Sequence, residues 1–193
     1  SNFTLVGPYV NTLNSPQESS ANAFNYSSGD AANRFEATNA YYHIDTIQRY
    51  IQSLGITNAH NSPIDVDPAA PQSHGSYSPS TYTMRLGHSG PCRPDRGEDG
   101  EVMLHEYGHA LHSDQVPGWG GTNPTTGRAE TRAMGEGFGD ILACAYFAPD
   151  YPFQREVFED WIFGDIGGLR RVDGTKVYPT DWVGSVHANG EIW

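Results

Sequence analysis

The sequence contains little cysteine, few positive charges and no long apolar stretch. Its 193 residues include two cysteines and 11 Lys and Arg against 23 Asp and Glu, which gives a formal net charge of −12. Two cysteines do not define a disulfide framework, so Cys92 and Cys144 are equally compatible with one bridge and with two thiols. The charge argues against nucleic acid or an anionic membrane surface as a partner. No apolar run approaches the roughly 18 residues of a membrane span.

The acidic surplus has two interpretations. The simpler one is solubility. The other is Ca²⁺ binding by clustered carboxylates, for which the candidates are Asp65, Asp67, Asp95 and Asp99. No segment matches the Asp-rich calcium loop, so Ca²⁺ stays a cofactor without an assigned site.

Apolar periodicity predicts alternating helices and strands with long connections. A first helix is expected to begin after Asp30 and to end at Gly55, with its buried face formed by Ala40, Ile44, Ile47, Ile51 and Leu54. Strands are expected at 64–67 and 81–86, with a Ser-Pro-Ser turn between them, and a short strand at 176–178. Further helices are expected at about 99–114, 129–148 and 153–163.

One segment carries the pattern of a metal site. Residues 102–112 read VMLHEYGHALH, which spaces His105, Glu106 and His109 as His-Glu-x-x-His. Positions four apart lie on one face of a helix, so two neutral imidazoles there can bind one Zn²⁺. Glu106 can then reach a water on the metal. The pattern needs a third protein ligand to be complete.

The third ligand is expected in the segment GEGFGD, residues 135–140. Glu136 supplies a carboxylate, and Asp140, four residues later, can accept a hydrogen bond from a ring nitrogen of His105 or His109. Each glycine costs about 1 kcal/mol in a helix relative to alanine, which makes sense where two helices must approach closely. A histidine six residues after His109, as metzincins have, is excluded because Gln115 stands there.

A third motif lies near the end of the chain, where residues 186–193 read VHANGEIW and include His187. The segments HEYGHALH, MGEGFGD and VHANGEIW, in this order, resemble the fungalysin-like branch of the thermolysin-type (gluzincin) zinc metallopeptidases. Two earlier segments, NAYYHIDTIQRYIQSLG and SYSPSTYTMRLG, look like the helix and the edge strand that precede the zinc helix in bacterial members. The resemblance covers most of residues 35–193.

The resemblance implies an α+β, zincin-like fold, with a small N-terminal antiparallel sheet followed by active-site helices and a truncated helical C-terminal subdomain. It divides the chain into residues 1–115, the sheet and zinc-helix subdomain, and residues 116–193, the incomplete start of the helical subdomain. It also implies one Zn²⁺ per chain and a secreted, extracellular protein. The implied site comprises zinc ligands His105, His109 and Glu136, general base Glu106, supporting carboxylate Asp140 and transition-state donor His187.

The chain departs from the family's pattern at three places. The loop before the glutamate ligand holds Trp119 and lacks the tyrosine that helps thermolysin-type enzymes to hold the oxyanion. Residues 74–77 of the edge strand read HGSY in place of an Asn-Ala pair before the aromatic residue. The sequence ends at Trp193, where the family continues into a helical subdomain.

We therefore predict a zinc metalloendopeptidase that hydrolyses peptide bonds by a zinc-bound water activated by Glu106. Its expected partners are protein or peptide substrates and the remaining C-terminal part of its own polypeptide, with no nucleic acid and no membrane. The alternative is a catalytically impaired, protease-like peptide-binding domain or an inactive fragment, which the three departures favour. An exopeptidase is disfavoured because no acidic run is suited to a free amino terminus.

Overall fold

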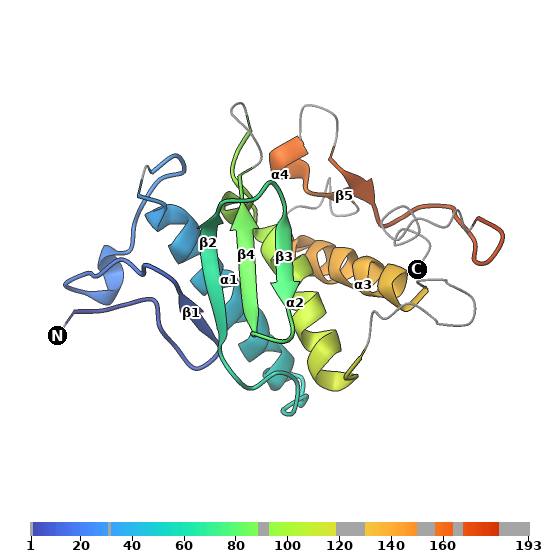
Figure 1. Ribbon diagram of the computed structural model, residues 1–193, viewed down its shortest axis with the longest axis horizontal. Coiled ribbons are helices and arrows are strands. Elements are labelled where there is room, and N and C mark those ends of the chain that lie inside the picture. Colours follow the sequence, from blue (N-terminus) through green and yellow to red (C-terminus); the bar gives the residue numbers. More distant parts are fainter. Residues whose placement is uncertain are drawn as a thin grey trace.

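The computed structural model describes residues 2–30, 32–88, 93–118, 130–149, 157–163 and 168–181. Four strands form the larger sheet in the order β1-β2-β4-β3, and two short strands, β5 and β6, form a second sheet (Figure 1). The strands are β1 Val10–Thr12, β2 Ile64–Ala70, β3 Gly75–Ser78, β4 Thr83–Gly87, β5 Val157–Phe158 and β6 Arg170–Arg171. The helices are α1 Arg34–Ser53, α2 Gly100–Gln115, α3 Glu130–Phe147 and α4 Asp160–Phe163, with 3₁₀ turns η1 Ala21–Ala23 and η2 Arg96–Glu98. The fold is therefore α+β, as predicted.

The larger sheet is mixed, so the expectation of an antiparallel sheet is wrong. β1 pairs with β2 and β2 pairs with β4 in parallel, and only β3 runs antiparallel to β4. The alternation of apolar residues predicts which face of a strand is buried, but it does not predict the neighbouring strand. Here α1 provides the long crossover that parallel β1 and β2 require. The Ser-Pro-Ser turn joins β3 to β4, which leaves β3 at the edge of the sheet.

Helix α1 covers one face of the sheet and forms much of the core (Figure 1). It begins later than expected, because Asn33 is its N-cap and the Asp30 carboxylate instead pairs with Arg34. Its last residue is Ser53, and Gly55 follows the C-cap as the expected terminating glycine, with a φ of +87°. Leu54 was wrongly placed on the buried face and is 59% exposed. The rest of the predicted face is confirmed as buried: Ala40, Ile44, Ile47 and Ile51.

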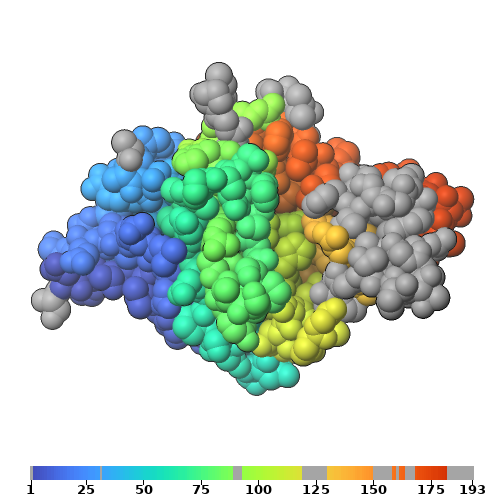
Figure 2. All heavy atoms as spheres, viewed as in Figure 1, coloured from blue at the N-terminus to red at the C-terminus, as the bar shows by residue number. Residues whose placement is uncertain are grey.

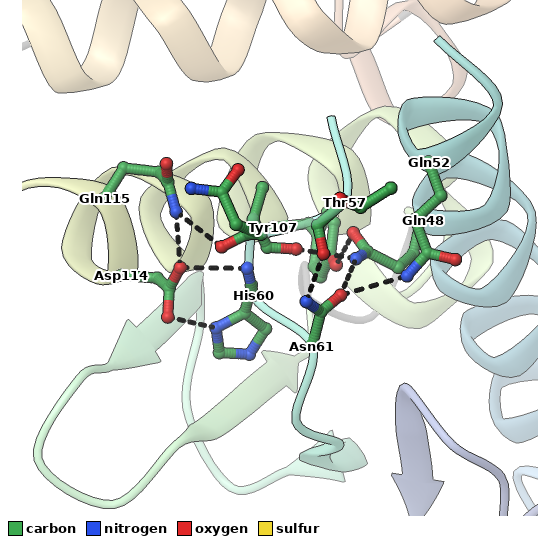
Figure 3. Close-up of polar contacts among 10 residues, drawn as sticks. Gln48, Gln52, Thr57, His60, Asn61, Tyr107, Asp114 and Gln115 are labelled. Carbon is green, nitrogen blue, oxygen red and sulfur yellow. Dashed lines mark hydrogen bonds and ion pairs between the residues drawn. The ribbon is translucent and has the colours of Figure 1, made fainter. Parts of the chain in front are cut away.

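Helix α2 is tied to the loop after α1 by a polar network (Figure 3). The buried Tyr107 hydroxyl donates to Gln48 Oε1 at 2.6 Å, and Gln48 Nε2 donates to the Ala59 carbonyl at 2.6 Å. In the last turn of α2, Asp114 Oδ2 accepts from the backbone N–H of His60 at 2.9 Å. Tyr107 and Asp114 point from α2 toward this loop (Figure 3). The bonds therefore hold α2 in place on the side that faces away from α3.

The chain beyond α3 differs from the prediction. The helix expected at 153–163 is confirmed only at its end, where α4 spans Asp160–Phe163, and it is wrong at Val157–Phe158, a strand that pairs with Arg170–Arg171. The expected strand at 176–178 has no strand partner among the described residues. Tertiary contacts overrode local propensity here, because the Phe158 ring lies 5.2 Å from that of His105. Within the described ranges, no helix is both long and apolar enough to cross a membrane.

Candidate metal centre

Helix α2 presents the His-Glu-x-x-His motif from a buried position. Its N-cap, Asp99, accepts a hydrogen bond from the backbone N–H of Glu101 at 2.9 Å, so the helix begins at Gly100, close to the predicted start. The apolar residues on both sides of the motif are buried: Val102, Met103, Leu104 and Leu111. His105 and Glu106 are only 5% and 7% exposed. The motif therefore lies in the core, at the contact between α2 and α3.

Two imidazoles from α2 and one carboxylate from α3 converge. His105 Nε2 lies 3.3 Å from Glu136 Oε2, and His109 Nε2 lies 3.7 Å from Glu136 Oε1. One donor atom from each residue lies within 4.8 Å of the other two. Nitrogen from two histidines with oxygen from one glutamate is a donor set of catalytic zinc sites. The residues present thus fit Zn²⁺.

Asp140 connects this centre to a basic residue that the sequence analysis missed. Asp140 Oδ1 lies 2.7 Å from His105 Nδ1, which leaves Nε2 of His105 turned toward Glu136. Arg170 donates to both oxygens of Asp140, from Nε and Nη2, at 2.7 Å each. Arg170 comes from β6 and also stacks over the Phe158 ring. Asp140 thus receives three hydrogen bonds and holds His105 in one orientation.

The pKa values of the centre reflect burial and close charges. Burial alone would lower the pKa of His105, but its bonds to Asp140 and Glu136 outweigh this and raise the pKa to about 10. Burial, followed by the charge of His105, lowers the pKa of His109 to about 4. Burial is also the main reason that the pKa of Glu106 rises to about 7. A carboxyl group whose pKa is raised toward neutral pH in this way is suited to proton transfer.

The glycines of the motifs allow the close helix contact that the sequence predicted. A Cβ on Gly108 of α2 would lie 3.0 Å from the Cα of Gly139 on α3. A Cβ on Gly139 would lie 2.7 Å from His105 Nδ1 and 2.9 Å from the His105 carbonyl oxygen. Any larger residue at either position would push the helices apart. The two glycines therefore set the distance between the ligands of α2 and Glu136.

Gly139→Ala is expected to weaken zinc binding without unfolding the chain. The new methyl group would overlap the His105 ring and backbone, which cannot both move away, so we expect zinc affinity to fall by about 10- to 100-fold, as for loss of a supporting residue. Competition with a chromophoric zinc chelator measures this. Ala143→Gly, four residues further along α3, is the control for altered helix propensity. Unchanged zinc affinity in Gly139→Ala would show that the close approach is not needed.

A cavity of about 450 Å³ opens beside the centre, lined by parts of β3, α2 and α3 and by residues 158–159 and 169–170. Figure 2 shows the atoms of the sheet (green) next to those of α2 (yellow) and α3 (orange). Glu106 lines the cavity and lies against the edge strand, because a Cβ on Gly75 would be 2.8 Å from Glu106 Oε1. Gly75 thus leaves room for the Glu106 carboxylate.

The structure brings together five of the six predicted site residues, whereas His187 lies outside the described residues, as do Trp119 and Cys92. Cys144 is buried in α3. His112 packs its ring 4.2 Å from that of Phe138. Besides Arg170, the sequence analysis missed the buried ion pair of Arg96 and Glu159 in the cavity wall. The sequence marks Arg170 only by the two adjacent arginines in GLRRV, residues 168–172, which is a weak indication of a buried ion pair.

Comparisons with known proteins agree with this geometry. The chain is 31% identical over 126 residues to "Extracellular metalloproteinase MEP" of Fusarium vanettenii, a match that covers 60% of the chain and 20% of that protein. The chain thus spans about a fifth of the length of this relative. The profile of the family described as "Fungalysin metallopeptidase (M36)" matches residues 74–193, which include α2, α3 and the cavity. The chain belongs to the fungalysin metallopeptidase family.

Proposed function

We propose that the protein is a zinc-dependent metalloendopeptidase that is secreted and cleaves protein or peptide substrates. The convergence of His105, His109 and Glu136, with Asp140 bound to the outer nitrogen of His105, carries this proposal. Family membership and the extracellular relative support it. The secreted location is inferred from that relative.

In the proposed reaction, Glu106 moves the proton. When bound, Zn²⁺ supplies a Lewis acid that polarises a carbonyl and lowers the pKa of a water. Glu106 accepts a proton from the attacking water and passes it to the leaving amine, for which its buried carboxyl, with a pKa of about 7, is suited. We assign His187 the donation of a hydrogen bond to the developing oxyanion, as the VHANGEIW motif implies. Asp140 and Arg170 keep His105 oriented throughout.

The edge strand provides a place for an extended substrate. β3 is at the edge of the sheet and pairs only with β4 among the described strands. Its residues 75–77 line the cavity that contains Glu106. A peptide that adds to such an edge is held by main-chain hydrogen bonds, which do not depend on side-chain amides. Substrate binding therefore does not need the Asn-Ala pair of the relatives.

Zinc removal is expected to abolish proteolysis and to leave most of the fold intact. The experiment measures zinc per chain by elemental analysis and casein cleavage with and without a chelator. We expect about one zinc per chain, chelator-sensitive cleavage, and recovery when zinc is added back. One zinc per chain without any cleavage would instead favour the alternative, a peptide-binding domain or an inactive fragment.

A further inference from the structure

A second group of carboxylates lies outside the candidate metal centre. Oxygen atoms of Glu36, Asp95 and Glu98 all lie within 4.8 Å of one another. Glu36 belongs to the first turn of α1, and the other two residues flank and end η2, the turn that leads into α2. Of the four acidic residues that the sequence offered as calcium ligands, only Asp95 is part of this group.

Glu36 is the unusual member of the group. It is 2% exposed, and its Oε2 atom has no hydrogen-bond partner among the described residues. Burial raises the pKa of Glu36, and the charges of Glu98 and Asp95 raise it further. A buried carboxylate beside two others is costly unless a cation compensates them.

The group is held in place by its surroundings. Asp95 and Glu98 form a capping box, in which the Asp95 backbone N–H donates to Glu98 Oε1 at 3.2 Å. Asn39 Nδ2 donates to the carbonyls of Gly97 and Glu98 at 3.3 Å each, which joins η2 to α1. A Cβ on Gly97 would lie 2.8 Å from the Glu36 Cβ, so only glycine lets the two segments meet this closely. The carboxylates are thus positioned before any ligand binds.

Two of the basic residues near the group in sequence pair with other acids, and a third, Arg93, donates to the Ile162 carbonyl at 3.3 Å. Arg34 pairs with Asp30, and Arg96 pairs with Glu159. His88 Nδ1 lies 2.9 Å from Asp95 Oδ2, but its side chain is 51% exposed, so this contact lies at the solvent edge. A carboxylate offers about four lone-pair sites, so Asp95 keeps the capacity to bind a cation.

We propose that Glu36, Asp95 and Glu98 form a Ca²⁺ site that joins α1 to the turn before the zinc helix. The donors are all oxygen, which suits Ca²⁺, with water completing its six to eight ligands. The nitrogen-containing set of His105, His109 and Glu136 suits zinc instead, so the two sites select different metals. Because η2 also carries Arg96, calcium at this site stabilises one wall of the cavity.

The test compares thermal unfolding of the zinc-loaded chain with and without added CaCl₂, in buffer freed of calcium and supplemented with zinc. We expect Ca²⁺ to raise the Tm of the wild-type chain by about 5 °C or more at 100 times its Kd, and Mg²⁺ at the same concentration to do less. Glu36→Gln is expected to lose this shift. Asp45→Asn removes one charge from the same helix, where Asp45 pairs with Arg49, and it is expected to keep the shift.

A second readout separates a metal ligand from a merely structural carboxylate. Without calcium, Glu36→Gln removes repulsion, so its Tm should exceed that of the calcium-free wild type. If Glu36→Gln does not fold, Glu98→Gln takes its place, since Glu98 is partly exposed. An equal calcium shift in the wild type and in the variant, or no shift in the wild type, would overturn the proposal. The zinc content of all variants should stay unchanged, which keeps this result independent of the proposed peptidase activity.

Discussion

Glu106→Gln is expected to lower kcat for casein cleavage by about 10³-fold and to leave zinc binding intact. The amide has nearly the shape of the carboxylate but cannot accept the proton of the attacking water. Glu106 is not among the three residues whose donor atoms converge, so one zinc per chain should remain. Steady-state cleavage of a fluorogenic peptide, together with elemental analysis, measures both quantities.

Glu106→Asp serves as the matched control for this change. It keeps the carboxylate but withdraws it by one methylene group, so we expect activity between that of Glu106→Gln and the wild type. Zinc content and the far-UV circular dichroism spectrum should agree among the three proteins. Activity above a tenth of wild type in Glu106→Gln would exclude Glu106 as the general base.

Arg170→Met is expected to destabilise the chain by about 3 kcal/mol and to lower zinc affinity by 10- to 100-fold. The side chains of Arg170 and Asp140 are 12% and 3% exposed, so this is a buried ion pair. Without the guanidinium, the Asp140 carboxylate stays buried and loses both hydrogen bonds from Arg170. Of the three bonds described above, it keeps the one with His105 Nδ1. Denaturant unfolding measures the stability, and competition with a zinc chelator measures the affinity.

Arg171→Met provides the control from the adjacent position. Arg171 pairs with Asp173 at the surface, where the two side chains are 56% and 51% exposed, and such pairs contribute little to stability. We expect its free energy of unfolding to change by less than about 1 kcal/mol. Equal effects of the two substitutions would refute the role that we assign to Arg170.

The parts of the site that follow from helical spacing were predictable from the sequence. His105 and His109 are one turn apart, as are Glu136 and Asp140, and a helix fixes each pair on one face. The glycines around Glu136 indicated that α3 makes a close contact with another helix. The spacing of residues within one helix is a local property, so it can be recognised directly in the sequence.

The parts that depend on contacts between distant segments were not predictable. Arg170 reaches Asp140 only because β6 pairs with β5, and neither strand was expected. Similarly, the buried carboxylate of Glu36 meets Asp95 and Glu98 across about sixty residues of chain, so no sequence pattern marks the group. The parallel pairing in the larger sheet was not predicted for the same reason. The periodicity of apolar residues does not indicate which strands pair.

The burial of α2 bears on the proposed peptidase activity. A peptide bond can be cleaved only when its segment becomes extended, and the buried residues 101–108 can extend only if the core opens. If copies of the proposed peptidase cleave one another, we expect the cuts at exposed segments before the helix with the His-Glu-x-x-His motif. Burial of the helix that supplies two proposed ligands and the proposed base thus also protects it from autolysis.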